Sequence, residues 1–295
     1  MHSLYSEENL RAWLAAGVTT VRDVGYSDTP DYLARRDALN RNPACARLIS
    51  ATPMITHSGG YGTVGVTGPD SARATVRRYV RRGADLVKIA IEDDLQGRTW
   101  PMMSSAEVTA AVQQAHAMKK KVAAHVSHVR NLPLALEAGV DDIAHMVVEP
   151  LPEAMAAAIA RAGIAWVPTL ELWKGVSEKH SLDWDKVAIR NTGIFFRAGG
   201  TIALGTDFNG YTIPFDTGFP ITEARLLLAA GLSPMDVIVA GTRNAAGVCG
   251  RASELGTVEK GKIADLLVVA RNPLEDISAL TETVQVYKDG RPVRR

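Results

Sequence analysis

Four polar side chains stand within or at the ends of short apolar runs of the sequence. Lys88 lies in DLVKIA, His125 in VAAHV, His145 in DIAHM and Asp207 in ALGTDF. Imidazole and carboxylate groups that meet at one place bind zinc or a similar divalent cation. Each residue alone is more simply explained as a core, rim or turn residue. Their repetition at equivalent positions of successive runs favours a common metal site.

Lys88 is the least expected of the four, because a buried ammonium without a partner is costly. A lysine amine that reacts with carbon dioxide becomes a carbamate, which is an anion with two oxygen ligands. Burial lowers the pKa of a lysine and supplies the neutral amine that this reaction needs. Beside a divalent cation the carbamate is stabilised where an ammonium would be repelled. We therefore predict that Lys88 is a carboxylated metal ligand.

The elements that must position these residues alternate along the chain. Apolar runs predict strands, and the segments between them have helical periodicity. One predicted helix opens with a capping box of Ser104 and Glu107, and others stop at Gly83 and Gly163. This alternation is typical of a parallel α/β fold, most often a TIM-like (β/α) barrel, whose strands end at one shared rim. Seven strands are predicted: GVTTVRDVG, ARLISATPMI, ADLVKIAI, KVAAHV, DDIAHM, IAWVPTL and TIALGTDF.

The end of the sequence has a different character. GTVEKGKIADLLVVARNP and TVQVYKDGRPV predict short strands joined by turns, with Asp289–Gly290 as a hairpin turn. We therefore predict a barrel over residues 1–252 and a small β appendage over residues 253–295.

Composition narrows the class of partner. The 295 residues carry a net charge of +1, which gives no reason to expect nucleic acid or an anionic membrane as partner. Cys45 and Cys249 have no metal or redox spacing, and the start of the sequence has no apolar core of a secretory signal. No run is long and apolar enough to cross a membrane. The expectation is a cytoplasmic protein that acts on a small molecule.

These motifs together resemble the amidohydrolase superfamily, in its imidazolonepropionase-like and prolidase-like branch. The resemblance rests on AAGVTTVRDVG, GADLVKIAIED, VAAHV with ALEAGVDDIAHM, ALGTDF, and LSPMDVIVAGTRNAAGVCG followed by GTVEKGKIADLLVV. It implies that the Lys88 carbamate holds metal and that His125 and His145 ligate the second metal position. Asp207 would ligate the first position and act as general base and then general acid. The cofactor would be one or two divalent ions, most simply zinc.

The sequence departs from the family at one point. The family's first barrel strand carries a His-x-His pair, and no such pair exists here. The resemblance thus implies a barrel incomplete at its N-terminus, with residues 253–295 as the remnant of the family's small β-sandwich domain. A coding region started too late, a strand supplied by another chain, or a site with one metal would each explain the difference. An exposed strand edge would favour a homo-oligomer.

Four further residues are predicted to contact substrate: His57, Tyr61, His128 and Tyr211, all in loops that follow predicted strands. The function implied is hydrolysis of a C–N bond, in an amide, dipeptide or cyclic amide, by a metal-activated water. An esterase or lactonase with the same site, and a ligand-binding remnant without catalysis, are the alternatives.

Overall fold

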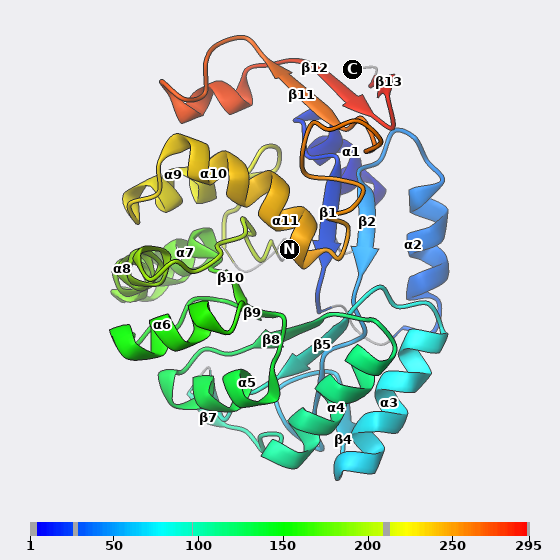
Figure 1. Cartoon of the computed structure of the whole chain (residues 1–295), viewed down its shortest axis with the longest axis vertical. Coiled ribbons are helices and arrows are strands. Elements are labelled where there is room, and N and C mark those ends of the chain that lie inside the picture. The colour runs from blue at the N-terminus through cyan, green and yellow to red at the C-terminus, as the bar shows by residue number, and fades with distance from the viewer. Residues whose placement is uncertain (1–4, 26–28, 96, 209–212, 294–295) are drawn as a thin grey trace.

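Parallel strands with helices around them make up most of the molecule (Figure 1). The computed structural model describes residues 5–25, 29–95, 97–208 and 213–293. No helix within these ranges is long and apolar enough to span a bilayer.

The parallel strands form a pair and a larger sheet that an isolated bridge joins. β1 (Thr20–Asp23) pairs with β2 (Arg47–Ser50), and a bridge between Ala51 and Leu86 joins β2 to the next sheet. A final bridge, from Trp166 to Ile202, adds the segment around residue 202. The larger sheet contains β5 (Val87–Ala90), β8 (Val122–His125), β9 (Asp142–Ala144) and β10 (Ala165–Val167). On the other side of β5 lies β3 (Ile55–His57), and β4 (Val64–Val66) pairs with β3 at the edge. The predicted α/β fold with a TIM-like barrel is confirmed.

Two predicted strands have different bounds in the structure. ARLISATPMI is divided into β2 and β3, because Pro53 between them has no backbone N–H to donate to a ladder. TIALGTDF pairs with β10 at the Ile202 bridge, where Ala203 N donates to Trp166 O at 2.9 Å. The next donor, Leu204 N, bonds Ala240 O at 3.1 Å instead, so pairing does not continue.

Helices cover the outside of the sheet, and their ends follow the sequence signals. The capping box of Ser104 and Glu107 is present at α4, and Gly83 and Gly163 take positive φ values of 108° and 73° after α3 and α6. The helices are α1 (Glu7–Ala15), α2 (Tyr32–Asn40), α3 (Pro69–Arg81), α4 (Ser105–Ala117), α5 (Leu132–Ala138), α6 (Glu153–Arg161), α7 (Leu170–His180), α8 (Trp184–Arg197), α9 (Ile221–Ala229), α10 (Pro234–Val239) and α11 (Ala245–Val248). A short hairpin of β6 (Asp94–Leu95) and β7 (Arg98–Thr99) follows β5.

The C-terminal segment forms an antiparallel sheet at one end of the molecule (Figure 1). It contains β11 (Leu266–Val269), β12 (Thr283–Lys288) and β13 (Arg291–Pro292). The predicted hairpin turn is confirmed, since Asp289 and Gly290 have φ values of 52° and 74° between β12 and β13. Positive φ at both central residues is the requirement of a type I′ turn.

Ion pairs join this sheet to the first strands of the barrel. Arg47 on β2 contacts Asp265 at 2.8 Å and Asp289 at 2.6 Å. Lys288 Nζ donates to the Cys45 carbonyl at 2.8 Å. Residues far apart in the chain thus share one interface.

Candidate active site

Lys88 lies on a strand whose four residues are all buried. Its side chain is 2% exposed, and Nζ has no hydrogen-bond partner among the residues that the structure describes. Burial lowers the pKa of Lys88 to about 8, although the negative charges of Asp142 and Asp207 oppose the shift. The amine is therefore held in surroundings that favour its neutral form.

Two imidazoles meet at the ends of neighbouring strands. His125 is the last residue of β8, and His145 directly follows β9, which pairs with β8. Their ring centroids are 4.8 Å apart, and both side chains are buried. His145 has a φ of 71°, an uncommon value for a residue other than glycine, so the chain turns sharply where the ring enters the site.

Glu92 holds the His125 ring from the end of β5. His125 Nε2 lies 3.2 Å from Glu92 Oε2, and Ser127 Oγ donates to the same oxygen. Burial of His125 lowers its pKa, against the raising effect of Glu92. Burial would raise the pKa of Glu92, but its hydrogen bonds with His125 and Ser127 hold it below the usual value. Since Glu92 engages Nε2, a ligand role of His125 falls to Nδ1.

The His145 ring is oriented by the strand beside it. Nδ1 lies 3.0 Å from Thr169 Oγ1, and the Trp166 indole donates to the His145 carbonyl at 2.6 Å. A ligand role of His145 therefore falls to Nε2. Each predicted histidine ligand thus has one ring nitrogen fixed by a neighbour, which is the usual arrangement for imidazoles that bind metal.

Asp207 completes the predicted set from the segment after Ile202. It has a φ of 56°. Burial lowers the pKa values of Lys88 and His125 and raises that of Tyr61, and the negative charge of Asp207 contributes an upward shift to each of the three. An electrostatic influence on all three requires that Asp207 lies near them. The structure therefore brings Lys88, His125, His145 and Asp207 toward one end of the strands.

The residues predicted to contact substrate occupy different places. Tyr61 stacks at 4.8 Å from the His125 ring, and burial raises its pKa to about 12. His128 lies further out, with Nδ1 2.8 Å from Glu149 and Nε2 3.8 Å from Glu92. His57 faces Glu107 at 3.1 Å instead, the carboxylate of the α4 capping box. Tyr211 lies outside the described residues.

The donor set suits a metal ion only if Lys88 takes part. In the described ranges no three or more His, Cys, Asp or Glu side chains are arranged to hold a metal ion. An unmodified lysine is no ligand of this kind, but carboxylation would convert its orphaned Nζ into an anionic oxygen donor. With the two imidazoles this gives three ligands, the number found in catalytic zinc sites. The residues present fit a divalent ion on that condition.

Sequence reasoning missed Glu92 and Thr169, which hold the two imidazoles. Glu92 belongs to IEDD, which reads as a solvated acidic loop, yet it is 1% exposed. A usable signal was its position four residues after Lys88, directly beyond the strand end. Thr169 follows WVP at the end of the next strand and has a φ of 52°.

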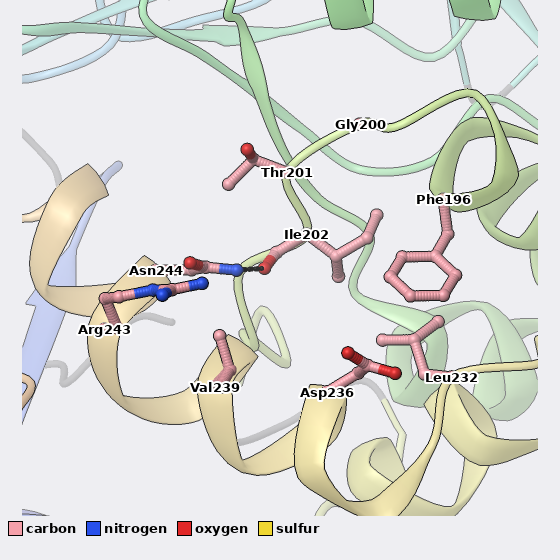
Figure 2. A pocket seen from close by; sticks show the side chains of 9 residues that line it. All are labelled: Phe196, Gly200, Thr201, Ile202, Leu232, Asp236, Val239, Arg243 and Asn244. Atoms are coloured by element: carbon pink, nitrogen blue, oxygen red, sulfur yellow. Dashed lines mark hydrogen bonds between the residues drawn. The ribbon is translucent and has the colours of Figure 1, made fainter.

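A pocket of about 170 Å³ lies away from these residues, at the N-terminal end of the 201–207 segment (Figure 2). Asn244 donates to the Ile202 carbonyl at 2.8 Å at its wall. Active sites of barrels lie at the other end of the strands, where Asp207 stands. The pocket is lined by Phe196, Gly200, Thr201, Ile202, Leu232, Asp236, Val239, Arg243 and Asn244, and none of the predicted site residues is among them.

Comparison with known proteins identifies the family. The model of the amidohydrolase family matches residues 3–293, nearly the whole chain. The chain belongs to the amidohydrolase family. This amidohydrolase is 29% identical over 246 residues to ochratoxinase from Aspergillus niger, a match that covers 76% of this chain and 49% of that protein. It therefore spans about half the length of that relative.

Other similar proteins point the same way. Imidazolonepropionase from Chromobacterium violaceum is 28% identical over 283 residues, covering 90% of this chain and 62% of that protein. A crystal structure of a Xaa-Pro dipeptidase with bound methionine superposes with a TM-score of 0.85 at 27% identity, covering 98% of this amidohydrolase and 77% of that chain. The structure of A. niger ochratoxinase has a TM-score of 0.83 at 22% identity, covering 99% of this chain and 74% of that chain, and it supports the fold alone.

Proposed function

We propose that this chain is a metal-dependent hydrolase of a C–N bond in an amide, dipeptide or cyclic amide. The observation that carries the proposal is the buried, unpartnered Nζ of Lys88 beside the paired rings of His125 and His145. The relatives are consistent with it, since they include ochratoxinase, imidazolonepropionase and a Xaa-Pro dipeptidase.

The residues that would hold the ion are the Lys88 carbamate, His125 and His145, with Asp207 beside them. Carboxylation joins Nζ of the neutral amine to the carbon of carbon dioxide and releases one proton. When bound, a zinc ion would supply Lewis-acid activation of water and of the substrate carbonyl. No redox partner is needed for this chemistry.

Asp207 would move the proton. Its carboxylate would accept a proton from the attacking water and then donate it to the leaving nitrogen, so that the C–N bond breaks without an unstable amide anion. The Tyr61 ring, which packs on His125, would exclude bulk water from that side.

Zinc content measured with and without bicarbonate tests the proposal. The wild type should take up zinc, and Lys88→Met should lose it while remaining folded. Lys288→Met is the matched control, because Lys288 is also buried but donates to the Cys45 carbonyl far from the site. Zinc retained by Lys88→Met would overturn the metal assignment.

The reaction is tested separately with a panel of N-acyl amino acids and the corresponding esters. Release of amine that disappears in Asp207→Asn supports C–N hydrolysis. Cleavage of the esters alone would support the esterase or lactonase alternative instead.

A further inference from the structure

We infer that Glu223 is a positioning residue for His145, acting through the N-terminus of α7 and Thr169. The inference rests on the proposed role of His145 as a metal ligand. Glu223 lies on α9, is fully buried, and its contacts reach the site through two intermediate residues.

Thr169 does not cap α7 with its side chain. This residue is the N-cap of α7, where a threonine hydroxyl commonly accepts a bond from a backbone N–H of the first turn. Its hydroxyl makes no such bond, because the backbone of Thr169 is left-handed (φ 52°, ψ 50°) and not extended as in a usual N-cap, and Oγ1 lies 3.0 Å from His145 Nδ1. The first N–H groups of α7 therefore need another acceptor.

Glu223 supplies that acceptor. Its Oε2 accepts from Glu171 N at 2.7 Å, and its carboxylate also bonds the backbone of Leu170. A side-chain oxygen that accepts from the first N–H groups of a helix satisfies donors that have no partner within the helix. Glu223 thus supplies the capping that the Thr169 side chain does not supply, while Thr169 contacts His145.

The cap belongs to a closed chain of contacts between α7 and α9. Glu171 Oε1, on α7, accepts from Asp216 N at 2.6 Å. Asp216 Oδ2 accepts from Thr222 N, in the first turn of α9, at 2.6 Å. Glu223 on α9 in turn accepts from the first turn of α7. The start of α7 is therefore held by a residue of α9, and the start of α9 is held by Asp216, which Glu171 of α7 fixes in place. A shift of this pair of helices would move Thr169, and with it the His145 ring.

The test removes the cap without touching the site. Glu223→Leu should release the start of α7, so that the His145 ring resonances of ¹⁵N-histidine-labelled protein change as they do in Thr169→Val. Glu223→Gln keeps an acceptor oxygen and should leave those resonances as in the wild type. The signals are assigned with His145→Gln, and the spectra are taken without metal.

Ser233→Ala is the matched control, since Ser233 caps a different helix, α10, where its side chain accepts from Asp236 N. It should lower the melting temperature and leave the His145 signals in place. An unchanged His145 spectrum in Glu223→Leu, or an equal change in Ser233→Ala, would overturn the inference. If Glu223→Leu does not fold, Glu223→Asp withdraws the carboxylate by one methylene and should change the same signals.

Zinc titration of the same variants separates the two proposals. Zinc should bind Glu223→Leu at least tenfold more weakly than Glu223→Gln, the lower end of the loss usual when a residue behind a metal ligand is removed. Failure of the wild type to bind zinc would contradict the proposed function. The His145 ring resonances of the metal-free protein would still decide the role of Glu223.

Discussion

Two buried cations on barrel strands differ in how their charge is compensated. Arg22 on β1 places Nη1 and Nη2 each 2.8 Å from the Asp142 carboxylate, and Nη1 also donates to the Val248 carbonyl at 3.0 Å. Lys88 on β5 is also buried, yet its Nζ has no hydrogen-bond partner in the described part of the chain. The charge of Arg22 is therefore compensated within the fold, whereas the amine of Lys88 would need a further group, such as the proposed carboxyl, to be compensated.

The difference shows what distinguishes a structural charge from a chemical one in the same barrel. A planar guanidinium stays charged and donates two hydrogen bonds to a carboxylate in a fixed bidentate geometry. An amine can lose its proton when it is buried, and a neutral amine is reactive. Four predictions test this contrast through the free energy of unfolding, from the largest expected change to the smallest.

Removal of the carboxylate from the paired cation should have the largest effect. Asp142→Ala leaves the Arg22 guanidinium buried and uncompensated, which should destabilise the fold by about 3–5 kcal/mol. Urea unfolding measures this loss. The double variant Arg22→Met with Asp142→Leu should recover most of it, and a loss as large as that of Asp142→Ala would show that the pair is not the cause.

Glu223 tests whether a buried atom without a hydrogen bond is enough to indicate a reactive group, because its Oε1 also has no partner within the described ranges. Burial raises its pKa to about 8, above the ordinary 4.5, so the folded state holds a proton that the unfolded state has lost between these values. Stability from this group is fully present below about pH 4.5 and falls as the pH rises toward 8, by up to ~1.4 kcal/mol per pH unit.

Glu223→Gln should remove that part of the pH dependence, as followed by urea unfolding across the same window. Zinc binding should survive in this variant, unlike in Lys88→Met. Glu178→Gln, at an exposed position of the neighbouring α7, should leave the slope unchanged. An unaltered slope in Glu223→Gln would show that the carboxylate is ionised in the fold throughout.

Replacement of the unpaired cation should have a smaller effect and the opposite sign. Lys88→Met removes an unsatisfied buried amine and keeps the length of the side chain, so the metal-free protein should gain about 1–2 kcal/mol. Thermal unfolding after chelation is the measurement. A clear loss of stability would mean that the ammonium of Lys88 is compensated in the folded protein.

An exposed cation completes the series with the smallest expected effect. Arg271 contacts Glu282 and Asp276 on the surface, and its side chain is 53% exposed. Solvent and salt screen such pairs, so Arg271→Ala should not change the melting temperature measurably. A loss close to that of Asp142→Ala would break the link between burial and dependence on a partner.

Much of this arrangement could be predicted from the sequence because periodicity and strand ends are local signals. Lys88, His125 and His145 were found from their places in apolar runs, and Asp289–Gly290 from its turn chemistry. Their supporting residues could not be found in this way. Glu92, Thr169 and Glu223 act through contacts across the chain, and each has an ordinary local context.

The Arg22–Asp142 pair shows the same limit. The partners are 120 residues apart, and either residue alone reads as a polar interruption of a strand. His57 shows the converse, since its position after a strand matched the pattern while its ring turned to Glu107. Strand position predicts which end of the barrel a residue approaches, but the direction of its side chain depends on neighbours that the local sequence does not contain.

The ion pairs of Arg47 have a consequence for how the protein is made. Its partners Asp265 and Asp289 are 218 and 242 residues further along the chain, and Arg22 bonds to a carbonyl 226 residues away. A ribosome that adds about 5–20 residues per second needs ten seconds or more to deliver those partners. During that time β1 and β2 are without these C-terminal partners, and a chaperone that shields the two strands should raise the yield of folded protein.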